Sequence, residues 1–326
     1  MVDSFGERLT QYASVPSEVS PATASRIAVD IRTFPWIRRL ASDYAFAYEN
    51  VAPFFAGNPA DPSAWADTIS RSQAHVRQPA ALAGIIAAQQ AQRHAPAEAR
   101  AAAAKLADPA ARVIITGQQA GAFGGPLFTL LKALTAMKLA ATVSRDHGVP
   151  VVPVFWIDAE DHDWAEVSSC TVLDAEMAPQ SVQLADLPGA GDLPIARLTL
   201  NDSITAALDA LAAALPDTEF RDETLAQLRD AYRPGAGMSL AFGRWIEAVL
   251  GPHGLVVYDS SDVAAKALAR DVFLKEIGAP GTTARLAART GEALVAKGYH
   301  AQAMLADDTV SLFHLNAERA AVRIEG

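Results

Sequence analysis

The amino-acid sequence predicts an α/β protein built on a parallel sheet. A β-branched run at residues 113–116 is followed by an amphipathic helical pattern, and then by a second apolar run that ends at Ile157. A strand, a helix and a strand within about 45 residues form a βαβ unit, whose strands run parallel and whose crossover is right-handed. Residues 255–258 form a third apolar run of the same kind.

Helices are expected to precede this unit. Apolar and aromatic side chains recur at helical spacing over residues 36–47, and residues 58–63 form a loop rich in Pro and Asp. Residues 64–106 have the pattern of two helices. The second covers 80–106, is rich in alanine and is broken at Pro96.

The βαβ unit itself contains three prolines that constrain it. Pro126 suits the first turn of the connecting helix. The apolar side of that helix is formed by Leu127, Leu130, Leu131, Leu134, Met137 and Ala141. Pro150 and Pro153 interrupt the second strand, and since proline cannot donate to a ladder, we expect pairing only over residues 154–157.

An insertion and further helices are expected after the second strand. The patterns predict short strands at 181–184 and 196–200, helices at 202–215, 223–232, 238–250 and 263–277, and a hairpin of 310–315 with 321–324. We therefore expect an N-terminal helical segment (1–110) that packs on a core (111–326), with an insertion around 168–235 and a C-terminal hairpin.

Composition excludes several classes of protein. The 27 Lys and Arg against 37 Asp and Glu give a net charge of −10, without a basic run, which argues against nucleic-acid and anionic-membrane binding. The single cysteine, Cys170, excludes a disulfide framework and a Cys-clustered zinc site. Residues 1–10 do not have the pattern of a secretory signal, and no apolar run reaches the roughly 18 residues of a membrane helix. We expect a soluble, cytoplasmic protein.

The glycine-rich segment 116–126 is the first candidate site. It leads from a strand into a helix, where unpaired N–H groups and the helix dipole suit a phosphate or carboxylate. Neither common nucleotide fingerprint fits, because Gly125 is followed by Pro126 and the spacing G-x-G-x-x-G is absent. Gln118 and Gln119 add side-chain donors and acceptors. The alternative is a close-packed turn between strand and helix.

The acidic run that follows the second strand is the other candidate. In a parallel sheet, ligands bind beyond the carboxyl ends of the strands, so this run and the glycine-rich segment should share an edge. In an extended chain, Asp158, Glu160 and His162 would lie on one side. Such groups can hold an ammonium, ligate Mg²⁺ or move a proton. The alternative is an acidic helix start, which accounts for Asp161 and Asp163.

Other residues give weaker signals. Asp259 and Asp262 either cap a helix or bind a ribose hydroxyl, and Arg233 lies in a segment whose glycines suit a mobile substrate loop. Cys170 is expected to be a small buried residue rather than a nucleophile, and Lys132 a solvated lysine two turns into its helix.

At the two strong segments, residues 113–127 and 149–167, the sequence resembles the bacillithiol biosynthesis cysteine-adding enzymes, the cysteine ligase family BshC. Residues 54–65, 106–109 and 242–259 agree more weakly. The resemblance implies a Rossmann-like core with inserted connecting segments. It also implies a ligase that adds L-cysteine to the amino group of glucosaminyl malate. Because forming an amide from a carboxylate is uphill in water, we expect ATP to activate the carboxyl group.

The resemblance assigns roles to residues of both segments. A cradle for phosphate or carboxylate would be formed by Gly117, Gln118, Gln119, Gly121, Gly124, Gly125 and Lys132. Glu160, Asp161 and Asp163 would hold an ammonium or Mg²⁺, and His162 would act as general base toward the sugar amine. Trp156 and Asp158, together with Asp163, would contact the substrate, and no set of resident metal ligands is assigned.

Members of this family are longer and carry a C-terminal half with a dimerising coiled coil, whereas this sequence has no sustained heptads. We therefore expect a fragment, a shortened relative, or a chain whose missing half is supplied by a second chain. A homodimer is the other expected assembly. Two other functions stay open. One is a non-catalytic subunit that binds a nucleotide or small molecule, and the other is a metal-dependent hydrolase built on Asp158, Glu160 and His162.

Overall fold

The computed structural model describes residues 29–75, 77–302, 309–315 and 319–323. Residues 1–10, for which we expect no secretory signal, and Ile324 of the predicted hairpin lie outside this part. The chain divides into two compact units after Val51. Within its described residues, the first unit consists of the 3₁₀ turns η1 (Ile31–Thr33) and η2 (Tyr48–Asn50) and of helix α2 (Arg39–Phe46), which is shorter than predicted.

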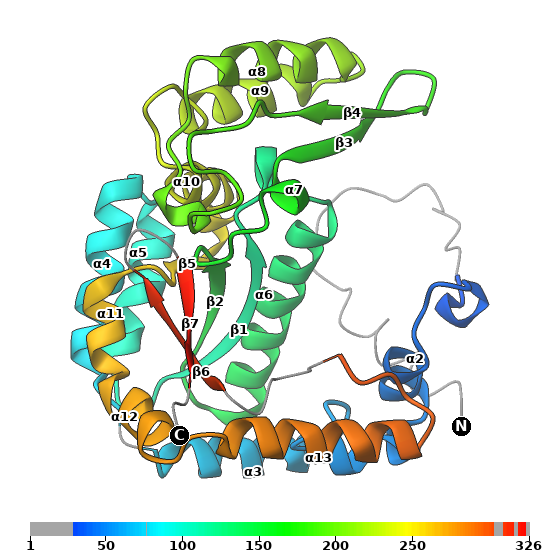
Figure 1. Cartoon of the computed structure of the whole chain (residues 1–326), viewed down its shortest axis with the longest axis vertical. Coiled ribbons are helices and arrows are strands. Elements are labelled where there is room, and N and C mark those ends of the chain that lie inside the picture. The colour runs from blue at the N-terminus through cyan, green and yellow to red at the C-terminus, as the bar shows by residue number, and fades with distance from the viewer. Residues whose placement is uncertain (1–28, 76, 303–308, 316–318, 324–326) are drawn as a thin grey trace. The chain divides into compact units, whose positions relative to one another are not determined.

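The second unit is built around a parallel sheet. Its strands are β1 (Arg112–Gln119), β2 (Val151–Asp158) and β5 (Val256–Asp259), in the order β1-β2-β5. Helix α6 (Phe128–His147) returns the chain from the end of β1 to the start of β2 (Figure 1). The predicted βαβ unit and the α/β class are confirmed. Because all three strands are parallel, their carboxyl ends lie at the same edge of the sheet.

The predicted limit on pairing at the prolines of β2 is wrong, because β2 pairs with β1 along its whole length. Successive residues of a strand turn their N–H groups to opposite sides. The carbonyl of Pro150 accepts a hydrogen bond of 2.8 Å from the N–H of Arg112. The nitrogen of Pro153 therefore faces the side of β5, whose pairing begins one residue later, at Val154. No hydrogen bond to β1 is lost.

Helices cover both faces of the sheet. Residues 64–106, predicted as two helices, lie in α3 (Pro62–Gln73), α4 (Pro79–Arg93) and α5 (Ala97–Ala104), with the turns η3 (Ala52–Phe54) before and η4 (Lys105–Ala107) after them. Pro96 separates α4 from α5 as predicted. One face of the sheet packs on Ile86, Ala102, Ala103 and Leu106 through Val152, Val154 and Val256. Phe155 on the other face contacts Phe242 of α10 (Met238–Leu250), with ring centroids 6.0 Å apart.

A buried ion pair connects α4 to α10. Arg93 Nε lies 2.7 Å from Glu247 Oε2, and the same guanidinium donates to the carbonyl of Val257 in β5 at 2.6 Å. Both side chains are at most 3% exposed. Burial raises the pKa of Glu247, although Arg93 opposes this effect. The pair fixes two helices and a strand of the core to one another.

The segment between β2 and α10 contains the predicted insertion. It forms α7 (Trp164–Val167), the antiparallel strands β3 (Ser169–Leu173) and β4 (Pro179–Gln183), the turn η6 (Ile195–Arg197), and helices α8 (Ser203–Ala214) and α9 (Arg221–Ala231). The strand predicted at 196–200 is wrong. The turn η6 takes its first residues, and Thr199 makes only an isolated bridge to Gly237.

The C-terminal part follows the turn η7 (Gly251–His253) and β5. The single helix predicted at 263–277 is divided at Ala269 into α11 (Val263–Leu268) and α12 (Arg270–Gly278), and α13 (Thr282–Ala296) was not predicted. Strands β6 (Thr309–Leu315) and β7 (Arg319–Arg323) form the predicted hairpin. No helix in the described residues is both long and apolar enough to cross a membrane. The division into segments 1–110 and 111–326 stays a prediction.

Candidate functional site

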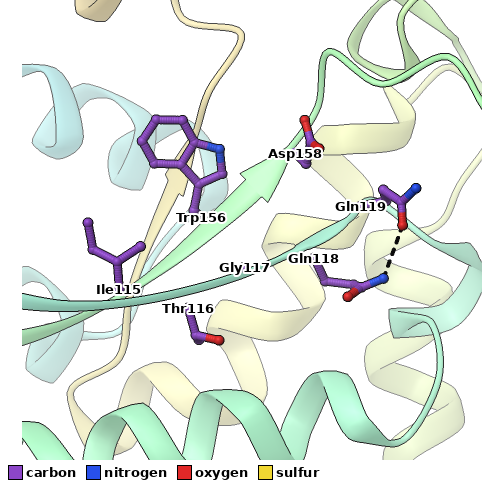
Figure 2. Close-up of a pocket in the computed structure, with 7 residues that line it drawn as sticks. All are labelled: Ile115, Thr116, Gly117, Gln118, Gln119, Trp156 and Asp158. Atoms are coloured by element: carbon purple, nitrogen blue, oxygen red, sulfur yellow. Dashed lines mark hydrogen bonds between the residues drawn. The ribbon is translucent and has the colours of Figure 1, made fainter. Parts of the chain in front are cut away.

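An open cavity of about 490 Å³ lies where β1 and β2 end. It is lined by Ile115, Thr116, Gly117, Gln118, Gln119, Trp156 and Asp158. In Figure 2, Trp156 and Asp158 stand on one side of the sheet, whereas Thr116 and Gln118 point toward the helix on the other side. Among the described residues β1 pairs with β2 alone, so the cavity extends around its open edge. The two segments singled out in the sequence therefore meet here.

Gly117 is explained by the close approach of the two strands. A Cβ at this position would lie 2.5 Å from the carbonyl oxygen of Trp156 and 3.1 Å from its Cβ. The first distance is shorter than any normal contact, so a side chain at residue 117 would push β1 away from β2. The glycine thus lies opposite Trp156, and the two glutamines that follow it lie beside Ile157 and Asp158.

The other glycines of the segment form a buried turn, which differs from the cradle of free N–H groups that we expected. The N–H of Gly121 donates to Gln119 O at 2.9 Å, and that of Gly125 to Ala122 O at 2.9 Å. The N–H of Gly124 donates to the hydroxyl of Tyr232 at 3.1 Å. Since all three donors have partners inside the chain, these glycines fit the alternative of a close-packed turn between strand and helix.

Side chains form a continuous network at the edge of the cavity. Lys132 Nζ donates to Gln118 Oε1 at 3.1 Å, and Gln118 Nε2 donates to Gln119 Oε1 at 3.1 Å. Gln119 Nε2 then donates to two carboxylates, Asp161 Oδ2 at 2.7 Å and Glu166 Oε2 at 2.8 Å. Lys132 is therefore half-buried and bonded rather than solvated as a free lysine. The network joins the glycine-rich segment to the acidic run.

Asp161 accepts more hydrogen bonds than the other carboxylate of this network, Glu166. Its Oδ1 accepts from the N–H of His162 at 2.7 Å and from the N–H of Asp163 at 3.3 Å. Burial acts to raise the pKa of Asp161, but the hydrogen bonds from Gln119, His162 and Asp163 outweigh it, so the pKa lies below its ordinary value. His162 Nδ1 lies 3.5 Å from the same Oδ1, an ion-pair distance when the ring is protonated. Asp161 therefore stays ionised beside an exposed imidazole.

Asp158, Glu160 and His162 do not share one side. The chain turns after Asp158, where the buried Ala159 donates its N–H to Ile157 O at 3.0 Å. We predicted a shared side for an extended chain, and the chain is not extended here. Glu160 instead forms an ion pair with Lys266 of α11. No group of three His, Cys, Asp or Glu side chains in the described residues is placed to hold a metal ion. The arrangement needed for the hydrolase alternative is therefore not formed by these three residues.

Several acidic residues have structural partners that account for them. Asp163 caps α7, because its Oδ1 accepts from the N–H of Glu166 at 3.1 Å. Asp262 caps α11 as predicted. Asp259 accepts from Ser239 Oγ at 2.5 Å and from Ser261, so its oxygens are also bonded within the chain. The capping alternatives thus hold for Asp163 and Asp262.

Two weaker candidates also receive a structural explanation. The segment around Arg233 is tied to the chain by backbone hydrogen bonds, from Gly235 N to Leu200 O at 2.8 Å and from Leu200 N to Ala236 O at 2.9 Å. These bonds tie Gly235 and Ala236 to Leu200, and the mobility of the segment stays a prediction. Cys170 is partly buried, and burial raises the pKa of its thiol, which fits a packing role.

Three residues of the site region were not predicted from the sequence. Glu166 shares Gln119 with Asp161, Lys266 pairs with Glu160, and Tyr232 bonds to the glycine-rich turn. The spacing of Asp163 and Glu166 resembles a capping pattern and marks a helix start. Nothing local marks Lys266 or Tyr232, since both reach their partners across more than 100 residues of sequence.

Comparison with known proteins gives a consistent family assignment. Residues 27–325 match the family model described as "Bacillithiol biosynthesis BshC, N-terminal Rossmann-like domain". A protein of Salinibacter ruber named "Putative cysteine ligase BshC" is 38% identical over 200 residues, which are 60% of this chain and 36% of that protein. Relatives of the same name from Chlorobaculum tepidum and Solibacter usitatus are 35% identical over 223 residues and 34% identical over 227 residues.

The alignments cover only part of the relatives. They take in 68% of this chain and 39% of the Chlorobaculum protein, and 69% of this chain and 42% of the Solibacter protein. The chain thus spans about two fifths of the length of the curated relatives that it matches.

Proposed function

This chain belongs to the bacillithiol biosynthesis BshC family through its N-terminal Rossmann-like domain, and from this premise we propose that it acts in adding L-cysteine to an amino sugar. The relatives are named as cysteine ligases, which supports a reaction that forms a C–N bond. The acceptor that we propose is the amino group of glucosaminyl malate. The product is the amide that completes bacillithiol.

The observation that carries the proposal is the meeting of the two family segments at Gln119 and Asp161. An ionised carboxylate beside an open cavity suits the ammonium form of an amine. Lys132 and Gln118 lie at the other end of the same network, and their amino and amide groups suit a substrate carboxylate. The site thus offers complementary contacts for a substrate that carries both kinds of group.

We propose that His162 removes a proton from the bound ammonium, so that the amine is neutral when its nitrogen attacks the activated carboxyl carbon. Its imidazole is exposed, and Nδ1 faces Asp161 at 3.5 Å, so the carboxylate stabilises the protonated ring. Asp161 orients the ring and Gln119 orients Asp161. Glu160 is assigned no role in the reaction, because its carboxylate pairs with Lys266.

Formation of an amide from a free carboxylate and an amine is uphill in water, so the carboxyl group of cysteine must be activated. We propose that ATP is the co-substrate that activates it. The amides of Gly121, Gly124 and Gly125 do not fit a phosphate cradle, because they already donate within the chain. We therefore assign no residues to ATP or to Mg²⁺ and derive no step through either.

The test is mass-spectrometric detection of bacillithiol from L-cysteine, glucosaminyl malate and ATP. We expect the wild-type chain to form the product, and the His162→Ala and Asp161→Asn variants to form it at least about a hundredfold more slowly. Asp174→Asn is the matched control. Asp174 also accepts from a glutamine, Gln180 Nε2 at 2.7 Å, and from backbone N–H groups, but it lies between β3 and β4.

The outcomes separate the competing functions. Full activity in both site variants would show that the catalytic residues lie elsewhere. Binding of a substrate by folded protein without any turnover would favour the non-catalytic subunit. Equal losses in Asp161→Asn and Asp174→Asn would mean that the activity follows stability and not the site.

A further inference from the structure

Tyr232, at the end of α9, reaches the glycine-rich turn from inside the core. Its side chain is fully buried. The hydroxyl donates to the carbonyl of Gly121 at 2.8 Å and accepts from the N–H of Gly124 at 3.1 Å. The ring meets Phe123 edge to face, with centroids 5.4 Å apart. One side chain therefore bonds both ends of the turn, from a helix more than 100 residues away in the sequence.

The turn that Tyr232 holds has a conformation that the chain seldom adopts. Phe123 has φ 52° and ψ 33°, in the left-handed region that a bulky residue rarely occupies. Gly124 has φ 93°, and a Cβ there would lie 2.1 Å from the ring of Trp245. Gly125 has φ 70° and ψ −160°, a combination open essentially to glycine. Phe123 keeps this unfavourable conformation only where its surroundings fix it, and the hydroxyl of Tyr232 supplies two hydrogen bonds that do so.

The turn is directly connected to the candidate site. The carbonyl of Gly121 accepts from Tyr232, and the N–H of the same residue donates to Gln119 O at 2.9 Å. The side chain of Gln119 holds both Asp161 and Glu166. The buried hydroxyl is thus connected to the two carboxylates at the cavity by hydrogen bonds that are joined through the covalent structure of Gly121 and Gln119.

We propose that Tyr232 is a positioning residue of the candidate site, whose hydroxyl fixes Gln119 through the glycine-rich turn and thereby holds Asp161 in place. Tyr232 contacts neither carboxylate, so it acts only through the turn. Burial raises the pKa of Tyr232 above its ordinary value, so the hydroxyl keeps its proton and remains a donor near neutral pH. The inference concerns the site on which the proposed function rests, but it does not need turnover to be tested.

The experiment follows the titration of the Asp161 carboxyl carbon by NMR in the 326-residue chain labelled with ¹³C-aspartate, with Asp161→Asn to assign the signal. Removal of the hydroxyl in Tyr232→Phe keeps the ring but releases the turn. Because Gln119 is a main cause of the low pKa of Asp161, we expect that pKa to rise by about half a pH unit or more in the variant. Leu228→Ala is the matched control, since it weakens the buried side of α9 without touching the hydroxyl.

A purely packing role predicts a different result. If Tyr232→Phe and Leu228→Ala both leave the titration of Asp161 at its wild-type position, Tyr232 does not position the site. Should Tyr232→Phe fail to fold, amide exchange of the wild-type chain decides. The Gly124 N–H is expected to exchange as slowly as the N–H groups of β2, and fast exchange would overturn the proposal. Either measurement gives its answer even if the chain forms no bacillithiol.

Discussion

Replacing Gln119 with glutamate tests whether one amide group separates two carboxylates. In Gln119→Glu the contacts of 2.7 Å to Asp161 and 2.8 Å to Glu166 become contacts between like charges. Two unit charges about 4 Å apart repel by about 1 kcal/mol in water and by about 4 kcal/mol at an effective dielectric constant of about 20. The side chain of Asp161 is 27% exposed and Glu166 is exposed, so the lower part of this range applies. For two contacts we expect a loss of about 2–4 kcal/mol in the free energy of unfolding at pH 8.

The sign of the pH dependence follows from the same repulsion. Mutual repulsion raises the pKa values of the three carboxyl groups in the folded variant above their unfolded values. The loss is therefore small at low pH and grows as the pH rises through the raised values. Urea unfolding at pH 5 and pH 8 measures it, and we expect the loss at pH 5 to be at most about half of that at pH 8.

The control places the same change at a single exposed contact. Gln180→Glu faces Asp174 across an exposed contact of 2.7 Å, and we expect it to cost clearly less stability than Gln119→Glu. If Gln119→Glu were as stable as the wild type at both pH values, the amide of Gln119 would not lie between the two carboxylates, and the network would be refuted.

Three further changes test the surrounding fold and the site. Gly117→Ala is expected to lower the free energy of unfolding by about 1–3 kcal/mol, because its Cβ would press on β2. Gly84→Ala, on the open side of α4, is the control and should raise the free energy of unfolding by about 0.5–1 kcal/mol. Equal effects of the two changes in urea unfolding would contradict the strand contact. Arg93→Met leaves the carboxylate of Glu247 buried without a cation and should cost about 3–5 kcal/mol in the same assay, so a loss below about 1 kcal/mol would speak against a buried pair. The lowered pKa of Asp161 means that its ionised form adds stability above the ordinary value of 3.8, and that this is lost as the pH falls through the lowered value. The difference in urea midpoint between wild type and Asp161→Asn should therefore shrink between about pH 6 and pH 3, and a difference constant over this range would contradict the assignment.

The sheet could be predicted because its elements are coded locally. Apolar runs bounded by glycine or by acidic residues gave β1, β2 and β5, and apolar spacing gave α6 and α10. The proline limit on β2 failed because the effect of Pro153 depends on which side of the strand its nitrogen faces. That side is decided by the register with a neighbour and not by the residue itself.

The candidate site could be predicted in part. Its place at the carboxyl ends of β1 and β2 follows from the parallel sheet alone, and Gln118 and Gln119 do line the cavity. The geometry of the acidic run does not follow, since a turn at Ala159 sends Glu160 to Lys266 and leaves Asp161 with Gln119. These partners are separated by 106 and 42 residues, so no local pattern could have selected them.

The most direct test of the account is a crystal structure of the chain with L-cysteine and glucosaminyl malate. We predict that the substrates occupy the cavity at the ends of β1 and β2, with the amine of glucosaminyl malate next to Asp161 and a substrate carboxylate near Gln118 and Lys132. Substrates bound at another surface, with this cavity empty in a chain that forms bacillithiol, would contradict the proposed site.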